Sequence, residues 1–200
     1  MDLFKVLEER RSIKKFVVGH EFTESEIEQL MSATLLSPTA FNIQNWRFVV
    51  VTDGEQKQKI FEIGYHQEQF IHCSAVVMIC GDRNAYCQDT ERYWANAPAQ
   101  TRQMLVGMIK QYYDAQPEAR RDENLRSGGM AAQSLMLAAK AMGYDSCPMS
   151  GFDFAAAASI INLPAEHDIV MAVTIGKALA PAQSRGGQLP LGEVVRRNSF

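Results

Sequence analysis

The sequence turns at Ser37-Pro38-Thr39-Ala40-Phe41-Asn42-Ile43-Gln44-Asn45-Trp46 and continues directly into Arg47-Phe48-Val49-Val50-Val51-Thr52. The second stretch is β-branched and aromatic and is bounded by Asp53-Gly54, which predicts a buried strand. In front of the turn, Thr23 and Glu26 have the spacing of a capping box, so we expect a helix from there to about Leu36. Pro38 would end that helix, because its ring cannot continue the backbone ladder.

Similar patterns predict the other elements. We expect helices near residues 3–7, 55–63, 130–142 and 154–161, and strands at 75–80 and 169–176. A short segment around 145–147 should lead into a turn at 148–151, and residues 82–127 should be helical. The helices cluster between strands without regular β-α-β alternation, which favours an α+β fold over a doubly wound sheet.

Size and charge narrow the class of protein. The chain has 200 residues, 46% hydrophobic and 22% charged, so one globular domain spanning 1–200 is the simplest expectation. The net charge of −3, with acids and bases interspersed, argues against a groove for nucleic acid. We find no apolar run of membrane-spanning length and no signal sequence, so we expect a cytoplasmic protein without a membrane partner.

The four cysteines predict no metal site. None lies in a C-x-x-C pair, and the histidines are scattered along the chain. Cys73 and Cys80 border or end the apolar run 75–79, where a free cysteine usually serves as a small buried hydrophobe. We therefore expect both in the core, in a reducing compartment.

A local cluster of cations stands out against this background. Arg10-Arg11-Ser12-Ile13-Lys14 places three cations and a hydroxyl within five residues, directly after an apolar helical stretch. Such a cluster can bind a phosphate or another anion. Together with the amide-rich turn at 37–46, it suits a flat, hydrogen-bonding ligand with an anionic tail, and flavin mononucleotide (FMN) is the obvious candidate.

Taken in order, five segments give the chain a family resemblance. They are the Arg-Arg-Ser-x-Lys-x-Phe start at 10–16, the Ser-Pro-Thr-x-x-Asn-x-Gln-x-Trp turn at 37–46, the Ala-x-Gln-x-Leu-x-Leu-Ala-Ala helix near 131–139, the Pro-x-x-Gly-Phe turn at 148–152 and the tail from Arg185 to Val194. In this order they resemble the nitroreductase superfamily of FMN-dependent NAD(P)H oxidoreductases. The resemblance implies an intertwined α+β homodimer with a central antiparallel or mixed sheet flanked by helices, and two FMN sites at the subunit interface.

The resemblance also implies a set of flavin contacts. Arg10, Ser12 and Arg185 would hold the phosphate, Arg11 and Thr39 would lie along the ribityl chain, and Lys14 would face the N1/O2 edge of the ring. The other subunit would contribute Pro38, Thr39, Ala40, Asn42 and Gln44. Pro148 and Gly151 would flank Ser150, whose backbone N–H would face N5, and Gln69 would lie before the second strand, close to the ring.

Simpler roles remain for several of these residues. Lys14 could be a solvated surface lysine, and Asn42 and Gln44 could satisfy only loop backbone groups. Ser150 lacks the G-x-S-x-G context of a hydrolase nucleophile. In the family role, Lys14 and Ser150 would be the catalytic pair, with Lys14 stabilising the negative charge of reduced flavin.

The implied activity is ping-pong hydride transfer through flavin N5, from NAD(P)H to a nitroaromatic, a quinone or a related small electrophile. Two alternatives stay open. The chain could store or sense FMN without turnover, or it could catalyse a specialised reaction such as reductive dehalogenation or flavin cleavage. A lid for such a reaction would lie in the variable stretch 82–127, and the tail 180–200 should pack on the partner subunit.

Overall fold

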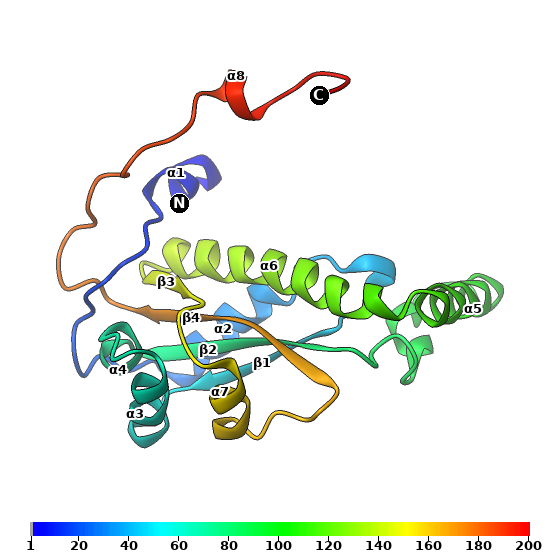
Figure 1. The fold of residues 1–200 in the computed structure, drawn as a ribbon, viewed down its shortest axis with the longest axis horizontal. Helices are drawn as coiled ribbons and strands as arrows, with labels where there is room; N and C mark the ends of the chain where they lie inside the picture. The colour runs from blue at the N-terminus through cyan, green and yellow to red at the C-terminus, as the bar shows by residue number, and fades with distance from the viewer. Residues whose placement is uncertain (1) are drawn as a thin grey trace.

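An antiparallel sheet organises the protein, which is described over residues 2–200 by a computed structural model (Figure 1). Its strand order is β1-β2-β4-β3. The strands are β1 (Trp46–Val51), β2 (Ala75–Asp82), β3 (Asp145–Met149) and β4 (His167–Gly176). All neighbours pair antiparallel. With helices on both faces of this sheet, the α+β prediction is confirmed.

Helices cover each face of the sheet (Figure 1). One core layer joins the sheet to the helices α3 (Gly54–Ile63), α4 (Gln69–His72) and α7 (Phe154–Ile160). The opposite layer joins it to α2 (Glu24–Thr34) and α6 (Pro117–Ala141). The remaining helical elements are α1 (Leu3–Glu9), η1 (Ala40–Asn42), η2 (Thr90–Trp94), α5 (Ala99–Ala115) and α8 (Leu191–Val194).

The central strand β2 is buried along its whole length, as a strand packed on both faces should be. Cys80 lies within it and Cys73 just before it, and both side chains are buried in the core. Burial raises the pKa of each thiol to about 12. The prediction that both cysteines belong to the core is confirmed.

The capping box before α2 is also confirmed. The Glu26 backbone N–H donates to Thr23 Oγ1 (3.3 Å), and the Thr23 backbone N–H donates to Glu26 Oε2 (2.9 Å). Glu26 additionally accepts a hydrogen bond from Tyr144 Oη, at the start of the segment that leads into β3. One carboxylate therefore fixes both the beginning of α2 and its packing near β3.

Two boundaries differ from the sequence prediction. The long helix begins at Pro117 rather than near Met130, because its first half buries polar side chains such as Asn124 and so lacks an apolar pattern. Pro148 lies inside β3, where the sequence suggested the start of a turn. Proline is tolerated there because β3 is an edge strand of the four-stranded sheet, and its only other pairing is a single bridge at Ser146.

The stretch 82–127 forms a small aromatic core beside the sheet. Tyr86, Tyr93 and Tyr113 pack there with Ile43 from the 37–46 turn. Helix α5 and the first half of α6 make up most of residues 82–127, so the helical expectation for the stretch is confirmed.

The C-terminal arm, residues 180–200, extends away from the body and curves over it (Figure 1). Its apolar side chains are exposed, with Leu191 at 75% and Leu189 at 60%. Helix α1, next to the arm, exposes Phe4 at 77%. Within residues 2–200, no helix has the length and apolar character needed to cross a membrane.

Candidate active site

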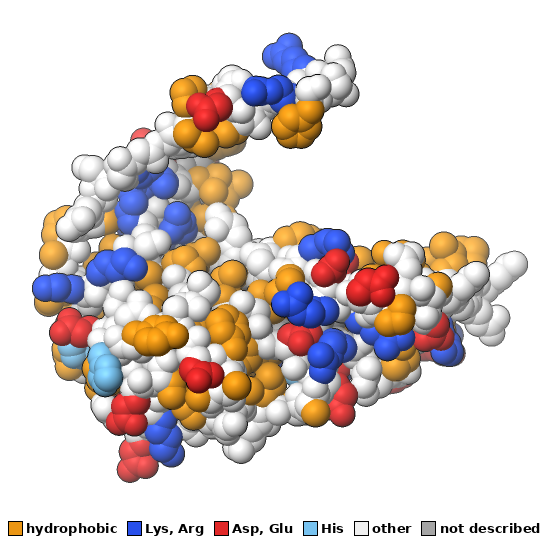
Figure 2. All heavy atoms as spheres, viewed as in Figure 1, with side chains coloured by type: hydrophobic (Ala, Val, Ile, Leu, Met, Phe, Trp, Pro, Cys, Tyr) orange, Lys and Arg blue, Asp and Glu red, His pale blue; other side chains and the backbone are white. Residues whose placement is uncertain are grey.

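The basic N-terminal segment and the arm enclose a cavity of about 620 Å³. It is lined by residues 10–15 and 180–188 and by no other part of the described chain. The predicted phosphate and ribityl residues are therefore brought together: Arg10, Arg11, Ser12, Lys14 and Arg185 all line it. Figure 2 shows Lys and Arg side chains gathered where the arm joins the body, beside the hollow between them.

Alternation of apolar and polar residues positions the basic segment. Ile13 and Phe16 are 5% and 1% exposed and anchor the segment in the core, whereas Ser12 and Lys14 stay exposed at the cavity. The Ile13 backbone N–H donates to the Ser146 carbonyl of β3 (3.0 Å). The segment thus runs beside β3 and forms a single parallel β-bridge with it, between Ser12 and Ser146.

The arm is fixed to this segment on its other side. The Leu179 N–H donates to the Lys15 carbonyl (3.0 Å), and Arg185 Nη2 donates to the carbonyls of Leu7 (3.0 Å) and Glu8 (3.3 Å) at the end of α1. Arg11 Nη1 also donates to the Glu8 carbonyl. These hydrogen bonds hold Arg11 and Arg185 close to Arg10. The acceptors are neutral carbonyl groups, so the positive charge of the two arginines is not compensated.

The cavity carries excess positive charge. Among the described residues, Arg10, Arg11, Lys14 and Arg185 form no ion pair with a carboxylate. Burial, followed by repulsion from Arg185 and Arg11, lowers the pKa of Arg10. A bound anion would relieve this repulsion, so the lining fits a phosphate.

Lys14 contacts a residue that the sequence did not single out for the site. Its Nζ donates to the Sγ of buried Cys147 in β3 (3.6 Å). Burial raises the pKa of this thiol, although Lys14 and Arg10 oppose the shift. The position of Cys147 directly before Pro148 was the available signal, but only the pairing of residues 12 and 146 shows that the two segments of the chain meet.

Ser150 and Gly151 follow β3 directly, and Ser150 is exposed. Pro148 is half-buried in the strand before them. The Gly151 carbonyl accepts a hydrogen bond from Gln67 Nε2 (2.7 Å). Gln69, predicted near the ring, lies on α4 at 8% exposure. Gln67, just before that helix, is the amide that contacts this turn.

The second predicted group lies elsewhere in the same chain. Pro38, Thr39, Ala40, Asn42 and Gln44 belong to the 37–46 turn, which leads into β1 and does not line the cavity. The turn (light blue in Figure 1) lies towards α5, at the far end of the body from the basic segment. A single protomer therefore assembles one half of the predicted site and not the other.

Comparison with known proteins identifies the family. The model of the Nitroreductase family matches residues 7–177. Protein DrgA of Synechocystis sp. is 44% identical, over 98% of this chain and 95% of its own. The chain belongs to the nitroreductase family. The oxygen-insensitive NADPH nitroreductase of Helicobacter pylori strain J99 is 28% identical, over 90% of each chain.

A solved structure supports the assignment of this chain to the nitroreductase family. A protein from Exiguobacterium sibiricum, crystallised in complex with FMN, superimposes with a TM-score of 0.91 at 28% identity, covering 98% of this chain and 97% of that one. As a member of the nitroreductase family, the chain is an oxidoreductase.

Proposed function

We propose that this chain is an FMN-dependent NAD(P)H oxidoreductase that reduces nitroaromatic, quinone or related electrophilic acceptors. The observation that carries the proposal is the cavity lined by Arg10, Arg11, Lys14 and Arg185 without a carboxylate partner. The FMN complex of one structural relative and the NADPH nitroreductase activity named for another support the same cofactors.

The residues present fit the phosphate end of FMN. Arg10, Ser12 and Arg185 would hold the phosphate by charge-assisted hydrogen bonds. Lys14 would present its ammonium to the N1/O2 edge, and the exposed backbone of Ser150 would lie beside N5. Bound FMN would supply the hydride chemistry that no side chain of this protein offers.

Lys14 has a simple electrostatic task. Reduction of a flavin places negative charge at its pyrimidine edge, so a fixed ammonium there favours the reduced state. The contact with Cys147 Sγ holds the lysine without neutralising it, since a thiol is a weak acceptor. NAD(P)H and the acceptor would use one open face in turn, which gives ping-pong kinetics.

The homodimer completes the site in this proposal. The 37–46 turn of one subunit would cover the cofactor held by the basic segment of its partner. Support comes from the separation of the two predicted groups within one chain and from the exposed apolar surfaces of α1 and the arm. Apolar patches of this kind mark interfaces between proteins.

Anaerobic reduction tests the function. The protein reconstituted with FMN should lose its visible flavin absorbance on addition of NADH or NADPH, and p-nitrobenzoate or a benzoquinone should restore it. Bound flavin that stays oxidised with both nucleotides would indicate storage rather than turnover. A chain that binds no FMN in a fluorescence titration would contradict the proposal itself.

Initial rates over a grid of nucleotide and acceptor concentrations test the ping-pong order. Parallel double-reciprocal lines are expected, and intersecting lines would require both substrates to bind together. A panel that includes a halogenated aromatic separates the general reductase from a dehalogenase, because only the latter would release halide.

A further inference from the structure

The 37–46 turn is strained in a way that its sequence does not explain. Phe41, Asn42 and Gln44 have φ values of 52°, 53° and 43°, in the left-handed region that side chains rarely occupy. Each such residue raises the energy of the folded backbone, and strained residues persist only where their surroundings over-determine them. Contacts with the surrounding structure must therefore hold these three residues in this conformation.

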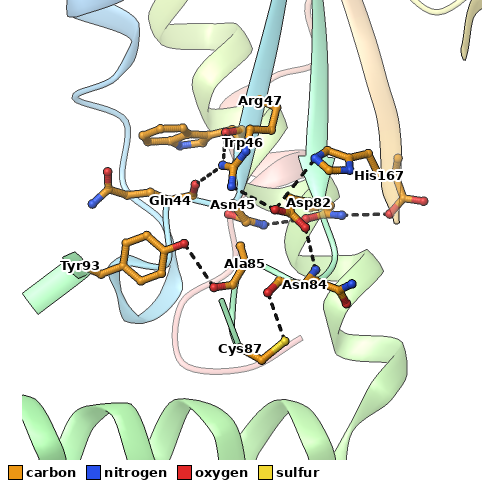
Figure 3. Close-up of polar contacts among 12 residues, drawn as sticks. Gln44, Asn45, Trp46, Arg47, Asp82, Asn84, Ala85, Cys87, Tyr93 and His167 are labelled. Carbon is orange, nitrogen blue, oxygen red and sulfur yellow. Dashed lines mark hydrogen bonds and ion pairs between the residues drawn. The ribbon is translucent and has the colours of Figure 1, made fainter. Parts of the chain in front are cut away.

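Those contacts come largely from one place, the supporting segment formed by residues 82–94, whose Asp82 is drawn with Arg47 and Gln44 in Figure 3. Trp94 Nε1 donates to the Phe41 carbonyl (3.1 Å), and Asn42 Nδ2 donates to the Tyr93 carbonyl (2.7 Å). The Asp82 backbone N–H donates to the Asn45 carbonyl (2.8 Å). The supporting segment thus binds the turn at its middle and near its C-terminal end.

Arg47 supplies the contact with the third strained residue. Its Nη1 donates to the Gln44 carbonyl (2.8 Å) and its Nη2 to Asp82 Oδ2 (3.0 Å). Asp82 is 5% exposed and accepts a further hydrogen bond from the Asn84 backbone N–H (2.8 Å), so it is a rigid partner. Arg47 consequently transmits the position of the supporting segment to Gln44.

Local contacts account for only part of this geometry. Within the turn, the Asn42 and Ile43 N–H groups donate to the carbonyls of Thr39 and Ala40 (both 3.1 Å), and the Gln44 N–H donates to Thr39 Oγ1 (3.0 Å). The carbonyls of Phe41 and Gln44 accept instead from Trp94 and Arg47. Without those donors, the backbone can relax to the ordinary negative φ region. Relaxation would redirect the side chains of Asn42 and Gln44.

We propose that Arg47 and Trp94 are positioning residues of the flavin site, which hold residues 41–44 in the left-handed conformation that presents Asn42 and Gln44 to the FMN of the partner subunit. This inference rests on the proposed function. It assigns the supporting segment the role of a scaffold whose strain preorganises the cofactor pocket.

Two variants with matched controls test it. Arg47→Met and Trp94→Phe remove the donors and keep much of the apolar bulk. Lys140→Met is the control for the first, since Lys140 forms a part-buried ion pair with Asp145 (3.1 Å) that lies outside both the turn and the supporting segment. Tyr144→Phe is the control for the second, because it also removes one buried aromatic donor, the hydroxyl that bonds Glu26, and makes no hydrogen bond to the turn or to the supporting segment.

Hydrogen exchange of the FMN-free protein provides the first readout. Amides of residues 39–45 should exchange about tenfold faster in both test variants, with β2 and β4 unchanged, whereas both controls should match the wild type. An unchanged rate at 39–45 in both test variants would overturn the inference. This measurement does not depend on the proposed function.

FMN affinity, followed by quenching of flavin fluorescence, provides the second readout. It should weaken by about tenfold in each test variant and by less than about twofold in the controls. The visible circular dichroism of bound flavin should also change only in the test variants. Faster exchange with unaltered affinity would overturn the positioning role, while a wild-type chain that binds no FMN would overturn the proposed function instead.

Discussion

At the residue scale, charge without a counter-ion is the feature that gives the cavity its chemistry. Lys14 and Lys15 are neighbours and both line it, but only Lys14 donates to Cys147 Sγ. The thiol is buried and its pKa is raised, so at neutral pH it remains a neutral partner. The contact with Cys147 therefore fixes the position of the Lys14 side chain without forming an ion pair.

Replacement of Lys14 by methionine should lower the flavin midpoint potential, because the cation that favours the reduced state is lost. We expect a shift of about 30 mV, which corresponds to roughly 1.4 kcal/mol for a two-electron couple. Xanthine-oxidase-coupled reductive titration against a reference dye measures it. Lys15→Met is the control, and equal shifts in both variants would remove the specific role of Lys14.

A second residue-scale prediction concerns Gly81. A Cβ at this position would lie 2.3 Å from Cγ of Asn124. Asn124 cannot move aside, because it accepts from Asn45 Nδ2 (2.8 Å) and donates to Asp168 Oδ2 (2.9 Å). Gly81→Ala should therefore cost about 1–3 kcal/mol of unfolding free energy in urea.

The control for that substitution lies on α5. Gly107 faces open space within the helix, so Gly107→Ala should stabilise the protein by about 0.5–1 kcal/mol. A Gly81→Ala variant as stable as the wild type would show that Asn124 has more freedom than its hydrogen bonds indicate.

At the element scale, one carboxylate joins α2 to the segment before β3. Hydrogen bonds from Tyr144 and then from Thr23 lower the pKa of Glu26 to about 2. Because the folded pKa lies below the ordinary glutamate value of 4.5, the stabilisation is fully present above about pH 4.5. It is lost as the pH falls through about 2.

Unfolding in urea between pH 2 and pH 6 checks this linkage. Glu26→Gln should flatten the loss of stability on the acid side, since the amide does not titrate. Glu28→Gln, on the same helix, should retain the wild-type dependence, because Glu28 makes no side-chain hydrogen bond among the described residues. Identical profiles for the two variants would contradict the role of Glu26.

At the scale of the whole molecule, the arm and α1 expose apolar surface that a lone protomer leaves in water. Leu191 and Phe4 are 75% and 77% exposed, yet the arm is fixed to α1 by Arg185. Because the arm is fixed and its leucine side chains are exposed, it is suited to pack against a second subunit of the same chain. The same association would bring a 37–46 turn to each cavity.

Leu191→Glu should weaken this dimer by about 3–6 kcal/mol, because each of the two subunits loses burial of one leucine. Light scattering coupled to size-exclusion chromatography over a dilution series measures the change. Tyr65→Glu is the control, since Tyr65 is 73% exposed but lies outside the arm and α1. A monomeric wild-type chain would refute the proposed assembly.

Local patterns were sufficient for most of the fold. The capping box at Thr23, the β-branched run of β1 and the apolar run of β4 each express a preference that depends on neighbours within one element. The start of α6 was missed because polar residues such as Asn124 are buried there against Gly81 and Asp168. The burial of these polar residues depends on tertiary contacts, so it leaves no periodic apolar pattern in the sequence.

Half of the candidate site could be named from the sequence, and its assembly could not. Arg10, Ser12 and Lys14 lie within five residues of one another, and a cluster of cations of this kind predicts an anion site without any knowledge of the fold. The contact of Gln67 with the Gly151 carbonyl depends on how the segment before α4 packs against the turn after β3, which no spacing reveals.

The sequence by itself determined the elements, the buried thiols and the cations, because these follow from side-chain chemistry and short-range periodicity. Only the tertiary structure decided that Lys14 meets Cys147, that Arg185 returns to α1, and that residues 82–94 hold the strained turn. These pairs are far apart along the chain. Their contact depends on how the burial of Ile13, Phe16 and the sheet fixes one arrangement of the whole backbone, which local preference does not encode.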